Sequence, residues 1–380
     1  MEKLHFHSFD AFRFFAFFKV FIFHASAVVI ASEGSTMQWV KDHIAHGGGI
    51  GVSFFFVLSG FLITYILTHD KIKHGNIKVK KFFVRRAFRI WPLFYAMVII
   101  AFIIPPDFAT KIGYYMNWGG YDPDWRFSFT FLENYKMIIM DNVPRTTPLS
   151  VFWSLCIEEH FYIVWMIVFF FLKRKWIPYY LGTTIVMAIL ARIFEQQIYG
   201  TELIGTNDLL TNADYFAISG LIGYFTAVNY KKVESFVLRI PLALRVGYVL
   251  ALCGVLLYQK AIFSYHNWFM DHFKYTIFSM MFAFLILIFI PQGSRLRIGD
   301  NNMLTRLGKI SYGLYVYHII WIHVVYQFFI DYSVPIDNWR AYLLFLFTTF
   351  VGTVVTSVLS WRYFEKPLLK YREKIFPSNS

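Results

Sequence analysis

Apolar runs of about 20 residues recur along the whole chain, and they limit its fold more than any other feature. A helix of that length crosses the hydrocarbon core of a bilayer. Hydrophobic residues make up 57% of the 380 residues and charged residues only 16%, which is more apolar surface than a water-soluble domain of this size can bury. Because backbone polar groups in lipid must be paired within their own segment, the sequence predicts an all-α, polytopic integral membrane protein.

These runs predict about ten transmembrane helices. Lys and Arg residues alternate between the connections: 24 lie in one alternate set, which includes both ends of the chain, and 8 lie in the other. By the positive-inside rule, both termini are expected in the cytoplasm. The expected spans are 9–31, 48–68, 88–105, 150–172, 177–194, 214–228, 241–259, 273–290, 310–330 and 340–361.

The distribution of basic residues also indicates which molecules the protein binds. A formal net charge of +13 is typical of nucleic-acid-binding proteins. Here the basic residues follow alternate loops rather than one soluble face, so we expect membrane lipids and no nucleic acid as partners. Cys156 and Cys253 lie in or beside apolar runs and predict neither a disulfide framework nor a zinc site.

The first apolar run carries a stripe of ionisable side chains. Arg13 and His24 are eleven residues apart, so on a helix they lie about 20° apart around the axis and about 16 Å apart along it. Asp10 falls on nearly the same stripe. Charged side chains inside a bilayer usually face a bundle interior or a polar cavity, so the stripe indicates a functional site. The alternative is that Arg13 reaches the membrane interface and His24 is a hydrogen-bonded packing residue.

A cluster of arginines follows the Lys-rich connection at the predicted cytoplasmic surface. Arg85 and Arg89 are four residues apart and share one helical face, and Arg86 lies beside them. Guanidinium groups suit bidentate contact with phosphate oxygens, so this face is a candidate phosphate-binding site. The alternative is an anchor that contacts anionic lipid.

The fourth apolar run carries Glu158, Glu159 and His160 in its predicted outer half, where ionisable side chains are costly and usually functional. Helix geometry places Glu158 about 12 Å, and His24 about 10 Å, from the outer ends of their helices. The two side chains are therefore expected at a similar depth.

The longest predicted outer connection, 106–149, combines aromatic and acidic side chains. Such side chains can stack on a sugar and hydrogen-bond to it, and they equally suit an aromatic belt at the membrane interface. The residues concerned are Trp118, Tyr121, Asp122, Asp124, Trp125 and Arg126.

Six segments, in this order, resemble the acyltransferase-3 family of bacterial membrane O-acyltransferases over nearly the full length of the chain. Ser53 stands where Asp is common in the family, and His160 where Gln is common, so neither is assigned a catalytic role. The segments are Arg13 with His24 after ten intervening residues, 51–64 (GVSFFFVLSGFLIT), 85–92 (RRAFRIWP), 153–162 (WSLCIEEHFY), 311–318 (SYGLYVYH) and 362–367 (RYFEKP).

The resemblance implies a ten-helix transmembrane domain over 1–367, followed by a short basic cytoplasmic tail over 368–380, in the bacterial inner membrane. It also implies an O-acyltransferase. The acyl group, usually acetyl from acetyl-CoA, would pass to a hydroxyl of an envelope polysaccharide, another cell-surface glycan or a lipid-linked sugar. No metal is expected.

Acyl transfer to a hydroxyl needs a base for the attacking O–H group, and histidine titrates nearest to working pH. We therefore assign His24 as the base, with Glu158 or Glu159 orienting it or stabilising its cation. The pantetheine arm of acyl-CoA would pass from the arginine cluster toward His24. The residues expected to bind the donor are Arg13, Arg85, Arg86, Arg89 and His318, although a packing role suits His318 equally well.

Two other classes of function stay open. Intramembrane Asp, Arg, His and Glu side chains also build proton relays, so the chain could be an exporter of glycan intermediates or a proton-coupled carrier. A third interpretation is a structural scaffold of a polysaccharide synthase complex. In a scaffold His24 would be dispensable, so replacing His24 distinguishes the scaffold from the acyltransferase.

Overall fold

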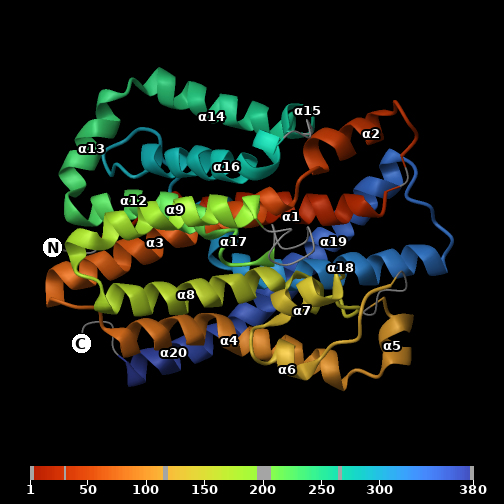
Figure 1. Ribbon diagram of the computed structural model, residues 1–380. Helices are drawn as coiled ribbons and strands as arrows, with labels where there is room; N and C mark the ends of the chain where they lie inside the picture. The colour runs from red at the N-terminus through yellow and green to blue at the C-terminus, as the bar shows by residue number, and fades with distance from the viewer. Residues whose placement is uncertain (1–3, 30, 114–118, 195–206, 264–267, 377–380) are drawn as a thin grey trace. The chain divides into compact units, whose positions relative to one another are not determined.

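The computed structural model describes residues 4–29, 31–113, 119–194, 207–263 and 268–376. The described residues are mainly α-helical and contain no β-strand (Figure 1). This confirms the predicted all-α fold class. Trp118 of the predicted outer connection and most of the 195–213 connection lie outside the described residues.

Each of the ten predicted spans corresponds to a helix, with ends that differ from the prediction by a few residues in most cases. The ten helices are α1 (Phe9–Ala27), α3 (Gly49–His74), α4 (Val79–Ile103), α8 (Trp153–Phe171), α9 (Ile177–Ile193), α12 (Ala213–Val228), α14 (Leu242–Leu257), α16 (Trp268–Phe289), α18 (Ser311–Asp331) and α19 (Trp339–Ser360).

The largest difference concerns α4, which begins nine residues before the predicted span and includes the arginine cluster within its first turns. Lys and Arg are good helix formers, so a basic segment continues a helix beyond the apolar run that predicts it.

Short elements occupy the connections. They are α2 (Thr36–Val40), α5 (Pro106–Lys111), α6 (Trp125–Ser128), α7 (Glu133–Met140), α13 (Tyr230–Arg239), α15 (Gln259–Phe263), α17 (Met303–Lys309), the π-helical η1 (Lys41–Ala45) and η4 (Trp361–Glu365), the 3₁₀ turns η2 (Leu149–Val151) and η3 (Arg174–Trp176), and α20 (Lys366–Ile375).

Length and composition identify fewer membrane spans than the ten predicted. Within the described residues, 7 helices are long and apolar enough to cross a membrane, or 8 if the α13–α14 pair, bent by 87°, counts as one span. The difference has physical causes: α12 has only 16 residues, and α1 carries Asp10, Arg13 and Lys19 within its 19 residues. The chain is a multi-pass helical membrane protein, and the number ten stays a prediction.

The chain divides into two compact units, which we describe separately. Unit 1 comprises Met1–Val20, His46–Lys78 and Ile157–Gly308, and unit 2 comprises Phe21–Ala45, Val79–Cys156 and Lys309–Ser380. The helices α1 and α8 contribute residues to both.

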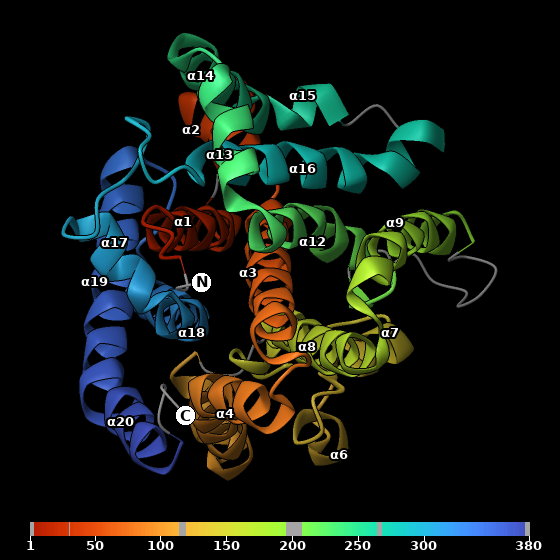
Figure 2. The ribbon, with the colours of Figure 1, turned by 90° about the vertical axis from the view of Figure 1, so that its left-hand side faces the viewer.

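Unit 1 is organised around α12, which packs against α3, α9 and α16 (Figure 2). Glycines allow the close approach of α12 to α3: a Cβ atom at Gly60 would overlap the backbone of Phe216, and one at Gly223 would overlap the carbonyl of Phe61. Small residues at the contact are how membrane helices gain packing energy, because lipid offers little hydrophobic driving force between helices.

Unit 2 is built from α4, α18 and α19, with α19 continuing through η4 into α20 (Figure 1). The Tyr312 hydroxyl of α18 donates a hydrogen bond to the Ile90 carbonyl of α4 over 2.8 Å. The Trp321 indole N–H donates to Thr356 Oγ1 over 2.9 Å and lies against Gly352, where a Cβ atom would overlap the ring. These contacts bring the 85–92, 311–318 and 362–367 segments into one unit.

Candidate active site

The structure joins His24 of α1 to His318 of α18 by a direct hydrogen bond within unit 2. His24 Nδ1 and His318 Nε2 are 2.9 Å apart, and the ring centroids are 5.1 Å apart at an interplanar angle of 29°. His24 is half-buried, whereas His318 is fully buried. Two segments that lie 294 residues apart in the sequence therefore form one polar centre.

The partners of His318 fix the proton positions in this pair. His318 Nδ1 lies 2.5 Å from the Tyr315 carbonyl oxygen, which only accepts hydrogen bonds, so Nδ1 carries the hydrogen. In a neutral ring His318 Nε2 is then the acceptor, and His24 Nδ1 must donate to it. This assignment places the lone pair of His24 on Nε2, where it can accept a proton.

Further hydrogen bonds hold the pair in position. The Tyr315 hydroxyl lies 2.7 Å from Ser154 Oγ at the start of α8 and 3.1 Å from the Val151 carbonyl. On the other side, Ser26 Oγ lies 2.7 Å from the Tyr342 hydroxyl of α19. Because both flanking contacts are buried, the backbone around His24 and His318 has little freedom to move.

Unit 1 holds the predicted carboxylates. Glu158 of α8 accepts a hydrogen bond from Ser59 Oγ of α3 over 2.5 Å and another from the Tyr162 hydroxyl one turn along its own helix. Glu159 is buried. The two hydrogen bonds to Glu158 fix the orientation of its carboxyl group. The pairing of Glu158 or Glu159 with His24 stays a prediction.

Arg13 and Asp10 form an ion pair in the first turns of α1. Arg13 Nη1 lies 2.5 Å from Asp10 Oδ1, and about a fifth of each side chain is exposed. The two side chains neutralise each other, which lowers the cost of placing them in an otherwise apolar helix. The carbonyl of Asp10 is covered by Gly308 of α17, where no side chain would fit.

The arginine cluster lies on the first turns of α4. Arg85 and Arg86 are half-buried and Arg89 is exposed. The Arg86 guanidinium stacks over Phe82 at 5.9 Å from the ring centroid. The buried Glu365 of η4, whose carboxylate accepts from Ser360 Oγ over 3.0 Å, lies within electrostatic range of Arg89. A carboxylate beside the cluster helps to orient the guanidinium groups toward an anion.

An apolar cavity of about 270 Å³ begins one helical turn beyond Arg89. It is lined by α4, α18 and the α19–η4 junction, and Tyr317, the neighbour of His318, is part of its wall. The full lining is Leu93, Ala96, Met97, Tyr317, Thr356, Leu359, Ser360 and Phe364. Unit 2 thus combines a basic cluster, an apolar cavity and the histidine pair.

The predicted outer connection, 106–149, contains a buried polar cluster and exposed aromatic residues. The Tyr121 and Ser128 hydroxyls both donate to the buried Glu133 carboxylate, over 2.6 and 2.5 Å. Burial raises the pKa of Glu133, and these two hydrogen bonds oppose that shift. Trp125, by contrast, is 62% exposed, so its ring can contact a ligand.

Comparisons with known proteins decide the family. The profile of the acyltransferase domain (Acyl_transf_3) matches residues 6–358, which is nearly the whole chain. The chain belongs to the acyltransferase-3 family. The six segments that carry the predicted resemblance, 362–367 apart, lie within the matched range.

Two relatives of this chain are named as O-acetyltransferases. The peptidoglycan O-acetyltransferase OatA of Listeria monocytogenes is 27% identical over 363 residues, which cover 91% of this chain and 54% of the relative. The O-acetyltransferase OatA of Staphylococcus aureus is 24% identical over 385 residues, which cover 97% of this chain and 58% of the relative. The acyltransferase chain therefore spans little more than half the length of these relatives. No solved structure matches it.

Two features of the structure were not predicted from the sequence. The contact of His318 with His24 was missed because a depth calculation for single helices does not say which helices pack together. The ion pair between Arg192 of α9 and Asp214 of α12, with side chains 1% and 0% exposed, was also missed. Opposite charges in two apolar runs were the available signal for it.

Proposed function

We propose that this membrane protein is an O-acetyltransferase that transfers an acetyl group from acetyl-CoA to a hydroxyl of a cell-envelope glycan. The family membership and the named O-acetyltransferase relatives support the reaction class. We further propose that it lies in the bacterial inner membrane with both ends in the cytoplasm, as the distribution of Lys and Arg indicates.

The observation that carries the proposal is the hydrogen-bond chain from His24 through His318 to the Tyr315 carbonyl. It leaves Nε2 of His24 as the proton acceptor for the attacking hydroxyl. When that hydroxyl loses its proton to His24, its oxygen attacks the acyl carbonyl carbon. The proton then passes from His24 to the departing sulfur as the tetrahedral intermediate collapses, so the base is regenerated.

Acetyl-CoA supplies the activated acyl group as a thioester. Its phosphates suit the guanidinium groups of Arg85, Arg86 and Arg89. Its flexible pantetheine arm suits the apolar cavity that begins one turn beyond Arg89 and is lined in part by Tyr317, the neighbour of His318 in the sequence. Arg13 lies on the same helix as His24, and we propose that it also contacts the donor.

Glu158 has a supporting role in this proposal. Ser59 and Tyr162 fix the orientation of its carboxyl group, which we propose stabilises the cation formed when His24 takes up a proton. Glu159, which is buried on the same helix, is the alternative for this role. On the acceptor side, the exposed ring of Trp125 offers a stacking surface for a sugar of the glycan.

The test is single-turnover transfer of radiolabelled acetyl from acetyl-CoA to peptidoglycan fragments by the purified chain in proteoliposomes. His24→Ala and His24→Gln should lose about 10²–10⁴-fold in rate, because neither side chain can take up the proton. Glu158→Gln should lose less, and the double variant should lose less than the two separate effects combined. His43→Gln, on η1, is the matched control.

Mass spectrometry of the envelope glycans from cells with and without the protein identifies the acceptor independently of the purified system. Near wild-type transfer by His24→Ala would remove His24 as the base. Glycans that differ in amount or location but carry the same acetyl groups would instead favour the transporter or the scaffold.

A further inference from the structure

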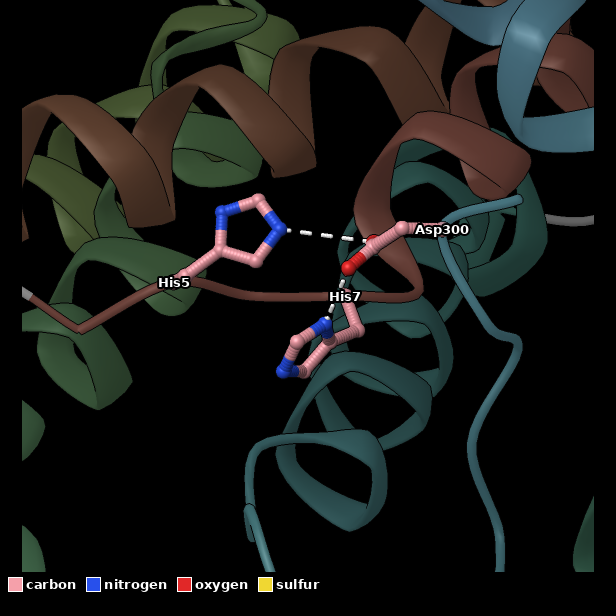
Figure 3. Close-up of side chains that lie close together, drawn as sticks. All are labelled: His5, His7 and Asp300. Carbon is pink, nitrogen blue, oxygen red and sulfur yellow. Dashed lines mark hydrogen bonds and ion pairs between the residues drawn. The ribbon is translucent and has the colours of Figure 1, made fainter.

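Two histidines and an aspartate converge at the start of unit 1, away from the residues discussed so far. His5 Nε2 lies 3.3 Å from Asp300 Oδ1, and His7 Nδ1 lies 2.5 Å from Asp300 Oδ2 (Figure 3). The rings of His5 and His7 meet edge to face with centroids 4.7 Å apart. The three ligand atoms that these side chains offer all lie within 4.8 Å of one another.

We propose that His5, His7 and Asp300 form a binding site for a divalent transition-metal ion of the zinc type. Two imidazole nitrogens and one carboxylate oxygen make up a ligand set that zinc binds in proteins, with a water completing the tetrahedron. Magnesium and calcium prefer sites built from oxygen ligands alone, so the two histidines select against them.

The geometry needs little change to accept such an ion. Ligands about 2.0–2.1 Å from a tetrahedral zinc lie about 3.3 Å from one another. His5 and His7 contact different oxygens of the Asp300 carboxylate, and three ligand atoms, one from each side chain, already lie within 4.8 Å of one another. Small rotations of the carboxylate and the rings would bring one carboxylate oxygen and the two nitrogens to the tetrahedral separation.

The alternation of residues 5 to 7 explains why both histidines face the same carboxylate. Phe6 is buried and packs against Phe61 and Tyr65 of α3, at centroid distances of 5.0 and 5.2 Å. Phe6 thus points into unit 1, whereas the side chains of His5 and His7 on either side of it are more exposed and both reach the Asp300 carboxylate.

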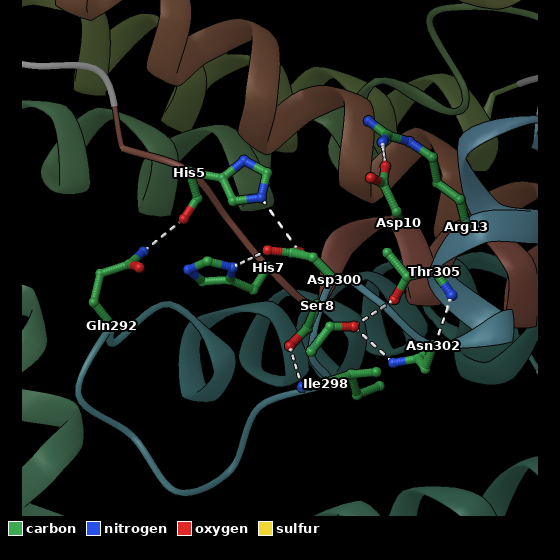
Figure 4. A network of polar contacts seen from close by, with 11 residues as sticks. His5, His7, Ser8, Asp10, Arg13, Gln292, Ile298, Asp300, Asn302 and Thr305 are labelled. Carbon is green, nitrogen blue, oxygen red and sulfur yellow. Dashed lines mark hydrogen bonds and ion pairs between the residues drawn. The ribbon is translucent and has the colours of Figure 1, made fainter.

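Hydrogen bonds hold both sides of the cluster before any ion binds (Figure 4). The Leu4 N–H donates to the Tyr65 hydroxyl over 3.1 Å. Gln292 Nε2 donates to the His5 carbonyl over 2.7 Å, as Figure 4 shows. The Ile298 N–H donates to Ser8 Oγ over 3.0 Å. The segment that precedes α1 is thus attached to both α3 and the 291–302 connection.

Asp300 is held equally well. Asn302 Nδ2 and Thr305 Oγ1 both donate to the Gly299 carbonyl, over 2.6 and 2.8 Å, and so fix the turn that presents the carboxylate.

Exposure leaves room for the remaining ligand. The side chains of His5, His7 and Asp300 are 64%, 27% and 33% exposed, so water reaches the cluster from solvent. A bound ion would cross-link the segment before α1 to the connection before α17. It would therefore stabilise the end of unit 1 that carries the Asp10–Arg13 ion pair.

The competing interpretation is that the carboxylate and two imidazoles form hydrogen bonds only. The full chain, purified in detergent and freed of metal with a chelator, should bind one equivalent of ZnCl₂ in calorimetry. It should show the visible absorption of tetrahedral cobalt with CoCl₂ and melt at a higher temperature with zinc. MgCl₂ should give none of these signals.

Variants identify the ligands. His5→Gln, His7→Gln and Asp300→Asn should each weaken zinc binding by at least the 10- to 100-fold that loss of an outer-sphere partner costs. His43→Gln and His272→Gln, which remove histidines outside the cluster, should bind zinc as the unchanged protein does. His5, the most exposed of the three, keeps the test decisive if the other two variants fold poorly. Absence of zinc binding by the unchanged protein, or unchanged binding by His5→Gln together with His7→Gln or Asp300→Asn, would overturn the proposal.

Discussion

The histidines of this chain differ in what their Nδ1 atoms contact. In His43 and His272 the Nδ1 atom hydrogen-bonds to the carbonyl four residues earlier, and in His318 to the carbonyl three residues earlier. His24 instead directs Nδ1 at another imidazole. A base is best oriented by a group that accepts its remaining hydrogen, and His318 supplies that acceptor without adding a charge.

His318 is therefore a positioning residue in the proposed reaction. His318→Ala should reduce the single-turnover rate of acetyl transfer by about tenfold or more, because the orientation and tautomer of His24 are no longer fixed. His318→Gln, whose side-chain oxygen can still accept from His24 Nδ1, should recover part of that rate. The KM for acetyl-CoA should change little if the arginine cluster dominates donor binding.

The matched control for this pair is His69→Gln, which replaces a buried histidine of α3 in unit 1. A rate loss that is equal in His318→Ala, His318→Gln and His69→Gln would indicate that burial alone matters. The role given to the hydrogen bond between His24 and His318 would then be wrong.

Arg85 and Arg89 provide the second prediction at the scale of single residues. Removing one charge-assisted contact should weaken acetyl-CoA binding by about 1.5–3 kcal/mol, since a phosphate loses one of its partners. Calorimetric titration of Arg85→Ala and Arg89→Ala with acetyl-CoA measures this. Arg126→Ala, an arginine 74% exposed on the predicted outer connection, is the control. If both variants bound acetyl-CoA with unchanged affinity, the cluster would be interpreted as an anchor that contacts anionic lipid.

At the scale of helices, the Arg192–Asp214 ion pair joins α9, α12 and α16. Arg192 Nη2 lies 2.8 Å from Asp214 Oδ2 and 2.7 Å from Thr276 Oγ1, and Arg192 Nε donates to the His272 carbonyl over 3.0 Å. Thr276 Oγ1 in turn lies 2.5 Å from the same carboxylate oxygen. The guanidinium of α9 thus has acceptors on two further helices, α12 and α16, which explains how a charge stays inside unit 1.

This network predicts a large effect on stability. Asp214→Asn leaves the buried guanidinium without its counter-charge, so the free energy of unfolding should fall by about 3–5 kcal/mol. Asp122→Asn makes the same chemical change in a pair whose carboxylate is 77% exposed, and it should cost less than about 1 kcal/mol. Thermal unfolding of both variants in detergent gives the comparison. Similar melting temperatures for the two would show that the buried pair contributes little.

The helices were predictable because a run of apolar residues long enough to cross a bilayer must pair its backbone polar groups internally, and a helix does this. The sequence placed Arg85 and Arg89 on one helical face but did not predict that this turn continues α4 from Val79, because a basic segment has no apolar signal although it favours a helix. In the candidate site, His24 and Glu158 could be chosen from their cost inside a membrane. Their actual hydrogen-bond partners, His318 and Ser59, depend on which helices pack together, and single-helix geometry does not contain that information.

At the scale of the whole molecule, the number of membrane spans decides on which side of the membrane each functional segment lies. Ten or eight spans place both termini on one side of the membrane, whereas seven place them on opposite sides. The count depends on whether α1, α12 and the bent α13–α14 pair each cross the membrane. The lipid-facing character of the other helices is clear from large exposed side chains, such as Phe171 at 78% and Phe347 at 68%.

The distribution of Lys and Arg favours the even number, and cysteine labelling tests it. In a background without Cys156 and Cys253, Asp122→Cys on the outer connection should react with a membrane-impermeant maleimide on intact cells. Met303→Cys at the start of α17, 70% exposed on a predicted cytoplasmic connection, should react only after permeabilisation. A reporter at the C-terminus should be cytoplasmic. If Asp122→Cys were protected until permeabilisation, the arginine cluster would face the outside, and a cytoplasmic acetyl-CoA could not reach it.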